Sequence, residues 1–324
     1  MMTPAVPPSP ETPPVSRIGE QLIASGQLTR DQVGQILALQ AEQRLRFGEA
    51  AIRLGYLRPE QVQQILSEQF GYATSLSGSE DALAVPLAIT HAPFSQEAEA
   101  IRQIRANLAS FQDDDGSLCF AVVSPAEGEG KSYLAASLAV AFAQTGQTTL
   151  LINANLRPSG QPEPLRPRDH NNPTGLSTVL SGRTSQLPVR TVPGYPQLAV
   201  LDAGPTPPNP LEILADPALR NLLGTLRQQY HIIILDTPPA RASSDALVIA
   251  RQTRLAIMVG RRDLTRLDHL QQVQRELTGH GVTLLGTVYN TFALPDTTSR
   301  LPSPGVLARL RQRVLAWRRR LLRR

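Results

Sequence analysis

The sequence is almost without lysine. Of its 32 lysine and arginine residues, Lys131 is the single lysine and the rest are arginines. Cysteine occurs once and aromatic residues make up only 4% of the chain. The scarcity of aromatics argues against binding of single-stranded nucleic acid by stacking, so we expect no nucleic-acid partner. Cys119 lies in the apolar run LCFAVV and is expected to be a core residue, and a lone cysteine excludes a disulfide within the chain.

Long hydrophobic runs are also missing. The longest, LAASLAVAFA, is too short to cross a bilayer. The first residues, MMTPAVPPSPETPPVS, show neither the basic nor the apolar region of a signal peptide, and residues 1–15 are expected to form a disordered, proline-rich tail. We therefore expect a cytoplasmic protein whose membrane contact is peripheral.

Positive charge is concentrated at the C-terminus. The last 20 residues hold eight arginines and no acid, so without them the formal net charge would change from +5 to +5 − 8 = −3. Apolar residues in this segment are spaced 3, 4, 3 and 4, which places one apolar stripe on an arginine-rich helix. The pattern predicts that residues 305–324 lie on an anionic membrane surface at the inner face of the cytoplasmic membrane. A helix docked on an acidic partner and a disordered tail are the alternatives.

An internal repeat occupies the N-terminal part of the chain. RIGEQLIASGQLTRDQVGQILALQ recurs, after a shift of 29 residues, as RFGEAAIRLGYLRPEQVQQILSEQ, which gives two 24-residue units with a five-residue spacer. Each unit is predicted to form two short helices, the first ending near Gly26 or Gly55. The second helix of each unit has apolar residues at helical spacing.

The lone lysine lies in SLCFAVVSPAEGEGKSYLAASLAVAFAQTG, which predicts a strand, a glycine-rich turn and a helix. This is the context of a phosphate-binding loop, in which backbone N–H groups at a helix N-terminus bind an anion. Lysine supplies a compact charge to the β- and γ-phosphates that arginine does not replace, and a serine hydroxyl binds Mg²⁺. Pro125 stands where the general motif has its first glycine. The predicted ATP-binding residues are Gly128, Glu129, Gly130, Lys131, Ser132 and Tyr133.

A later apolar strand, YHIIILDTPPA, ends at Asp236. A carboxylate after a buried strand near a phosphate-binding loop is the usual ligand for Mg²⁺ or its water, so Ser132 and Asp236 are the predicted Mg²⁺ ligands. Strands alternate with helical patterns, which predicts an α/β class with a parallel sheet flanked by helices.

About 200 residues resemble the bacterial tyrosine autokinases of polysaccharide biosynthesis, specifically the EpsG-like chain-length-determinant kinases. The resemblance rests on the segments GLSTVLSG, AGPTPPNPLEIL, LDTPPARASSDALVIA, LGTVYN and EAIRQIR. It implies a P-loop kinase that uses ATP and Mg²⁺, with Asn290 contacting the base. It also implies homo-oligomers that form through Glu99, Arg102 and Arg105, which share one helical face, and a membrane chain-length determinant protein as partner.

Two departures from this family concern catalysis. Its second nucleotide motif normally carries two acids, whereas LINANLR has Asn153 and Asn155, whose amides are not useful bases. The family also usually ends in a tyrosine cluster, whereas the last tyrosine here is Tyr289, in a predicted strand. With Lys131 and Asp236 these asparagines complete the candidate catalytic residues. An autokinase, a nucleotide-sensing scaffold without turnover, and a Min- or Par-type partitioning ATPase remain open.

The N-terminal repeat resembles the cyclic di-GMP-binding N-terminal domain of type II secretion and type IV pilus ATPases. Cyclic di-GMP is two-fold symmetric, so a duplicated half-site can present one unit to each half, and arginine can pair with guanine or phosphate. The alternative is a docking module whose repeated residues form its core. The candidate ligand residues are Arg17, Gly19, Gln32, Arg46, Gly48 and Gln61.

These observations predict five regions. They are the tail at 1–15, a tandem helical domain at 16–72, a linker at 73–91, a P-loop kinase-like domain at 92–292, and a linker with the basic amphipathic helix at 293–324.

Overall fold

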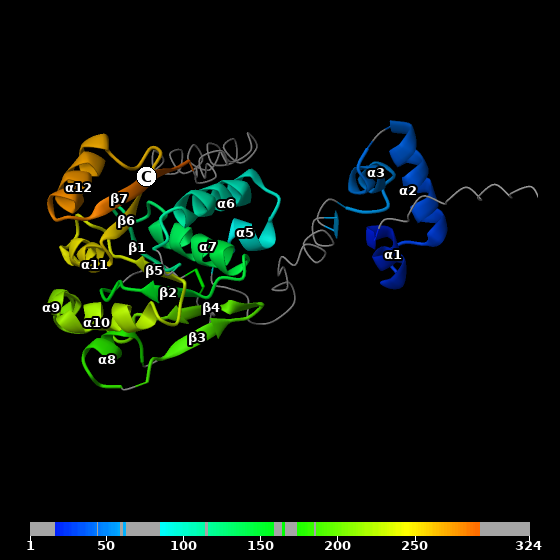
Figure 1. The fold of residues 1–324 in the computed structure, drawn as a ribbon. Helices are drawn as coiled ribbons and strands as arrows, with labels where there is room; N and C mark the ends of the chain where they lie inside the picture. The colour runs from blue at the N-terminus through cyan, green and yellow to red at the C-terminus, as the bar shows by residue number, and fades with distance from the viewer. Residues whose placement is uncertain are drawn as a thin grey trace, which may run out of the picture.

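The structure is a computed structural model of the 324-residue chain, and it describes residues 17–43, 45–58, 61–62, 85–113, 116–158, 164–165, 174–184 and 186–291. The tail expected at 1–15, the greater part of the expected linker and the basic helix expected at 305–324 lie outside the described residues. The described residues form a helical unit and an α/β unit, each with its own apolar core (Figure 1).

The helical unit contains α1 (Arg17–Ala24), α2 (Arg30–Gln43) and α3 (Phe47–Arg53). Gly26 and Gly55 follow the first helix of each repeat at φ +70° and +72°, a left-handed conformation that favours glycine. The predicted helix ends are therefore confirmed. Buried residues also recur at the shift of 29 residues: Leu22 and Leu28 in the first repeat are equivalent to Ala51 and Leu57 in the second.

The α/β unit is built on one seven-stranded sheet in the order β3-β4-β2-β5-β1-β6-β7. All neighbouring strands are parallel except β3 and β4, which run antiparallel. The predicted α/β class is confirmed. Its elements in chain order are α5 (Ala88–His91), α6 (Gln96–Ala109), β1 (Leu118–Val123), α7 (Lys131–Ala143), β2 (Thr149–Asn153), α8 (Leu176–Leu180), β3 (Val189–Val192), β4 (Tyr195–Leu201), α9 (Pro210–Ala215), α10 (Pro217–Leu226), β5 (Ile232–Asp236), α11 (Asp245–Thr253), β6 (Leu255–Arg261), α12 (Leu267–Gly279) and β7 (Thr283–Asn290).

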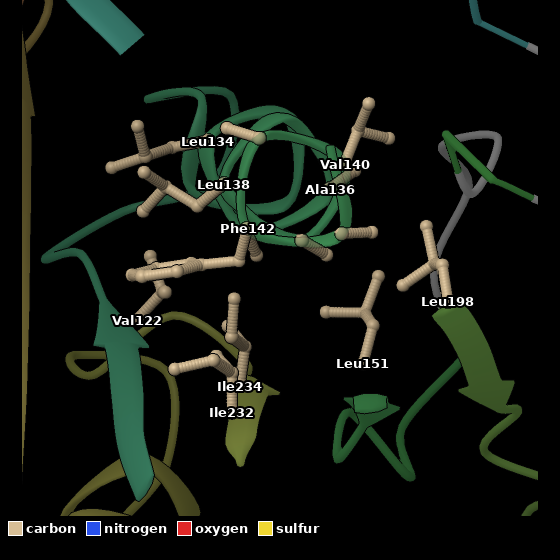
Figure 2. Close-up of a cluster of buried hydrophobic side chains, with 14 of the residues drawn as sticks. Val122, Leu134, Ala136, Leu138, Val140, Phe142, Leu151, Leu198, Ile232 and Ile234 are labelled. Carbon is tan, nitrogen blue, oxygen red and sulfur yellow. The ribbon is translucent and has the colours of Figure 1, made fainter. Parts of the chain in front are cut away.

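Helices cover both faces of the sheet, so the central strands β1, β2 and β5 are buried along almost their whole length. Every residue of β1 is buried, and its side chains alternate between two cores. On one face, Val122 and Ile234 lie beneath Phe142 of α7 (Figure 2). On the other face lies Cys119, which is fully buried, and this burial raises the pKa of its thiol to about 12. The core position predicted for Cys119 is confirmed.

The α/β unit begins earlier than the expected boundary at residue 92. Leu87 and Ile89, which were expected in the linker, are 0% and 1% exposed and belong to the core beneath α7. They are held there by α5, whose first amide, on Ala88, donates to Tyr133 Oη at 2.8 Å. A short apolar segment in a serine- and glycine-rich stretch gave too weak a pattern to predict this helix. Within the described residues, no helix has the length and apolar character needed to cross a membrane.

Candidate nucleotide-binding site

The predicted site residues converge where parallel strands end. In the sheet, β5 lies between β1 and β2, and Asp236 is in register with Val122 on one side and Asn153 on the other. The carboxyl ends of these strands therefore place the loop after β1, Asn153 and Asp236 at one edge of the sheet. Ligands of open α/β sheets bind at this edge.

The glycine-rich loop has the predicted form of strand, turn and helix. Gly128 and Gly130 have φ +77° and +97°, so both need glycine, and Gly130 caps α7. Lys131 is the first residue of α7 and is 9% exposed. The unpaired amide N–H groups of the first helical turn provide the anion-binding end of α7.

Pro125 does not disturb the start of the loop. Its carbonyl oxygen accepts from Arg241 N at 3.1 Å, and Ser124 O accepts from Ala240 N at 2.9 Å. The segment that follows Asp236 therefore holds the loop through backbone groups that do not depend on glycine at position 125.

The end of β6 and the end of β7 also contact the loop. Arg261 Nη1 donates to Gly128 O at 2.8 Å, and Asn290 Nδ2 donates to Glu129 O at 3.0 Å. A Cβ atom on Gly130 would lie 2.4 Å from Asn290 Nδ2, so Asn290 closes directly over the loop. Its expected contact with the base stays a prediction. Sequence reasoning missed Arg261, which lies far along the chain from the loop and in no motif.

Asn153 and Asn155 are both bound within their own turn. Asn153 Oδ1 accepts from Asn155 N at 3.0 Å, and Asn155 Oδ1 accepts from Arg157 N at 3.3 Å. Aspartate at either position would accept the same bonds, so this turn has the geometry for the two carboxylates but lacks their charge.

Arg157 in the same turn forms a two-pronged ion pair with Asp245 at the start of α11. The distances are 2.6 Å from Nε to Oδ2 and 3.0 Å from Nη2 to Oδ1, and the Asp245 side chain is 0% exposed. The bond to Asp245 raises the pKa of Arg157. The pair joins the segments LINANLR and SDA, a connection that sequence reasoning did not predict.

The donor set at this edge suits Mg²⁺ bound together with a nucleotide. Ser132 carries a hydroxyl in the first turn of α7 and Asp236 a carboxylate at the end of β5. Mg²⁺ commonly takes one or two protein oxygens and completes its shell with phosphate oxygens and water. In the part of the chain that the structure describes, no cluster of three or more His, Cys, Asp or Glu side chains could hold a metal ion by itself.

Tyr133 turns its side chain away from the loop. Its hydroxyl accepts from Ala88 N, and burial raises its pKa to about 12. The side chain of Tyr133 therefore joins α7 to α5, which leaves its backbone N–H as the predicted contact with phosphate.

The two segments GLSTVLSG and AGPTPPNPLEIL lie against each other. Leu176 N donates to Asp202 O at 2.8 Å, and Ser177 N donates to Ala203 O at 3.0 Å. The approach is close enough that a Cβ atom on Gly175 would lie 2.3 Å from Gly204 N. Backbone hydrogen bonds and this close approach therefore join the two segments directly.

The predicted subunit-contact residues on α6 make contacts inside their own unit. Arg102 Nη2 donates to Pro93 O at 2.6 Å, Arg105 Nη1 donates to Ala141 O at 3.4 Å, and Arg102 pairs with Glu99 at 3.5 Å. The Glu99 side chain is 59% exposed and that of Arg102 15%. Their role between subunits stays a prediction.

In the helical unit, several candidate cyclic di-GMP residues have structural roles. Gln32 Oε1 accepts from Thr29 N at 2.8 Å and Gln61 Oε1 accepts from Arg58 N at 2.9 Å, which are equivalent capping interactions in the two repeats. A Cβ atom on Gly48 would lie 2.5 Å from Val62 Cγ1. These two glutamines therefore have a structural role at helix starts, and their contact with cyclic di-GMP stays a prediction.

The remaining candidate residues for cyclic di-GMP are Arg17, Gly19 and Arg46. Gly19 is buried, whereas Arg46 is exposed at the start of α3. The Arg17 side chain lies outside the described part.

Comparison with known proteins places this site in a family, although no protein-family model matches the chain. The tyrosine-protein kinase YwqD of Bacillus subtilis strain 168 is 32% identical over 203 residues, which cover 61% of this chain and 82% of YwqD. CapB of Staphylococcus aureus, also named a tyrosine-protein kinase, is 30% identical over 214 residues, 66% of this chain and 92% of CapB. Etk of Escherichia coli K12 is 30% identical over 213 residues, but the chain spans only 28% of Etk.

Solved structures agree with these relatives. The kinase domain of the Escherichia coli tyrosine kinase ETK matches with a TM-score of 0.58 and 27% identity, over 65% of this chain and 84% of that domain. The chimerical protein CapA2B2 matches with a TM-score of 0.56 and 31% identity, over 66% of this chain and 98% of that one. The chain belongs to the bacterial tyrosine-protein kinases.

Proposed function

We propose that the protein is an ATP-dependent tyrosine autokinase that regulates exopolysaccharide polymerisation or export, including chain length. One observation carries the proposal. The buried Lys131 begins α7 at the sheet edge where Asp236 and Asn153 also lie, in a chain of the tyrosine-kinase family. The expected partners are further copies of the chain and a membrane chain-length protein, with peripheral membrane contact through residues 305–324.

The residues at this edge divide the work of phosphoryl transfer. Lys131 and the α7 N-terminus would bind the phosphates, and Ser132 and Asp236 would hold Mg²⁺, which neutralises phosphate charge when bound. A tyrosine Oη would form a bond to the γ-phosphorus as the bond to the ADP oxygen breaks. The phenol proton must leave, and the amides of Asn153 and Asn155 do not accept it. This favours slow transfer, or a nucleotide-sensing scaffold as the second candidate.

Intact-mass spectrometry of the full chain with Mg²⁺ and ATP separates these functions. If the protein is an autokinase, the wild type should gain the mass of one or more phosphate groups, and the Lys131→Ala variant should gain none. Arg251→Ala, a change at an exposed arginine on α11, should behave like the wild type. ATP binding without any gain of mass would support the scaffold. If ATP did not bind to the wild type, the assignment of a nucleotide site would be wrong.

We further propose that the helical unit binds cyclic di-GMP. Two observations support this: the duplicated cores at a shift of 29 residues, and the exposed Arg46 at the position equivalent to Arg17. Titration calorimetry with cyclic di-GMP should detect binding that Arg46→Ala abolishes. Arg53→Ala is the matched control, because Arg53 is also exposed on α3 and has no counterpart in the other repeat. If the wild type did not bind cyclic di-GMP, this proposal would be wrong, and the alternative of a docking module would be favoured.

A further inference from the structure

Glu129 is among the residues predicted to bind ATP, yet its carboxylate carries the same sign of charge as the phosphates. The side chain is 1% exposed, so it is turned into the protein. A buried carboxylate is costly unless hydrogen bonds satisfy it. Here Oε2 accepts from Ala126 N at 2.7 Å, and Oε1 accepts from the Thr265 hydroxyl at 2.5 Å.

Thr265 lies in the segment between β6 and α12, far along the chain from Glu129. Its hydroxyl has one proton, which it donates to Glu129, and its oxygen accepts from Arg261 N at 2.7 Å. Both hydrogen-bonding roles of this side chain are therefore used in one arrangement. Serine can reproduce the arrangement, whereas valine has the same shape and neither role.

The same segment reaches the loop a second time through Arg261, which donates to Gly128 O. Consecutive loop residues, Gly128 and Glu129, are thus fixed from the end of β6. The loop needs such contacts, because glycines with positive φ flank Glu129 on both sides and glycine imposes little conformational preference of its own.

We propose that Arg261 and Thr265 form a brace that sets the phosphate-binding conformation of the loop, so that these two residues act as positioning residues for nucleotide binding. The brace acts in two ways. It fixes the direction of the loop amides, and it keeps the Glu129 charge turned away from the phosphates. The inference rests on the proposed function only in that ATP binds at this loop.

The test compares Thr265→Val with Thr265→Ser in the full chain. Titration calorimetry with ATP and with ADP, each with Mg²⁺, gives the affinities, and thermal melting without nucleotide gives the stability of each variant. We expect Thr265→Val to weaken both affinities by about 10-fold or more, since a hydrogen bond to a charged group is lost. Thr265→Ser should stay within about threefold of the wild type, because its hydroxyl restores the bond.

The matched control is Leu264→Ala, which changes the neighbouring side chain of the same segment. Leu264 is 50% exposed, so this variant should bind ATP as the wild type does. If Thr265→Val does not fold, Glu129→Gln takes its place. Its amide keeps the shape of Glu129 but can accept only one of the two hydrogen bonds, so it should also weaken both affinities, and unchanged affinities would overturn the proposal.

Each result decides the proposal. Unchanged affinity in Thr265→Val would overturn it, and so would equal losses in the serine and valine variants, because the hydroxyl would then not be the cause. A loss in Leu264→Ala as large as that in Thr265→Val would also overturn it. A wild type that binds neither nucleotide would refute the proposed nucleotide site as well, whereas the other failures leave that site intact.

Discussion

At the scale of single residues, the neutral amides of Asn153 and Asn155 leave two positions of the candidate nucleotide site without a carboxylate. Replacing both with aspartate should raise the initial rate of phosphate incorporation by about 10²-fold, because a carboxylate can take the tyrosine proton. The turn should be preserved, since each Oδ1 keeps its backbone N–H donor. Mass spectrometry over time in Mg²⁺ and ATP measures the rate.

The control for this gain is Asn221→Asp, which adds a charge at an exposed position of α10. It should leave the rate unchanged. If the double variant binds ATP as tightly as the wild type yet transfers phosphate no faster, the missing carboxylates do not limit the reaction.

Exposure singles out one acceptor among the described tyrosines. Tyr289 on β7 is 63% exposed, whereas the others are buried or partly buried. An acceptor ring has to be accessible in order to enter a nucleotide site, so we expect peptide mapping to place phosphate on Tyr289 and Tyr289→Phe to remove most of it. Tyr230→Phe is the matched control and should incorporate phosphate normally. Phosphate found mainly at Tyr72, or at any of the less exposed tyrosines, would contradict this prediction.

Residue roles were predictable where a local motif requires them. Lys131 could be placed from its glycines and the following helix, and the structure puts it at the first position of α7. The capping roles of Gln32 and Gln61 were not predicted, because a helix cap and a ligand contact leave the same polar residue in the sequence. Thr265 could not be found at all, because its contact with Glu129 joins residues that only the fold brings together.

At the scale of elements, strength of pattern decided what could be predicted. The strands β1 and β5 are continuous apolar runs followed by recognisable turns, and both are present. The four-residue helix α5 was missed because its few apolar residues show no full helical period. Its position depends on a tertiary contact, the bond from Ala88 N to the Tyr133 hydroxyl.

The ion pair between Arg157 and Asp245 joins the turn after β2 to α11. Removing Arg157 leaves a fully buried carboxylate without its cation, so Arg157→Ala should lower the free energy of unfolding by about 1–3 kcal/mol. Asp245→Asn should cost less, because a neutral amide is cheaper to bury. Chemical denaturation measured by circular dichroism gives both values.

Arg220→Ala provides the comparison for this pair, since Arg220 is an exposed arginine whose Nε donates to the neutral Gln252 Oε1 at 3.1 Å. Its effect should stay within about 0.5 kcal/mol, as for ordinary surface changes. Equal effects of Arg157→Ala and Arg220→Ala would show that the pair does not anchor the turn.

At the scale of the whole molecule, the class of fold followed from the alternation of strands and helices, and the described sheet confirms it. The start of the α/β unit could not be predicted in this way, because residues before position 92 join its core through packing. The order of the strands in the sheet could not be predicted from the sequence either. This order places Asn290 of β7 against the loop that follows β1.

The thiol and the phenol groups buried in the α/β core predict how the stability of the protein changes at alkaline pH. Burial raises the pKa of Cys119 from 9.0, and those of Tyr133 and Tyr195 from 10.0, to about 12 in each case. The unfolded chain loses these protons at the ordinary values while the folded chain keeps them. The stabilisation is therefore complete below pH 9.0 and is lost as the pH rises toward about 12.

Melting temperatures measured between pH 8 and pH 11 test this alkaline response. The wild type should lose stability steeply above pH 9, whereas Tyr195→Phe, which keeps the buried ring and removes the titrating hydroxyl, should decline less. Tyr289→Phe changes an exposed ring and should follow the wild type. A slope shared by all three proteins would mean that Tyr195 does not remain protonated in the folded state, and the alkaline loss of stability would then have to arise elsewhere in the core.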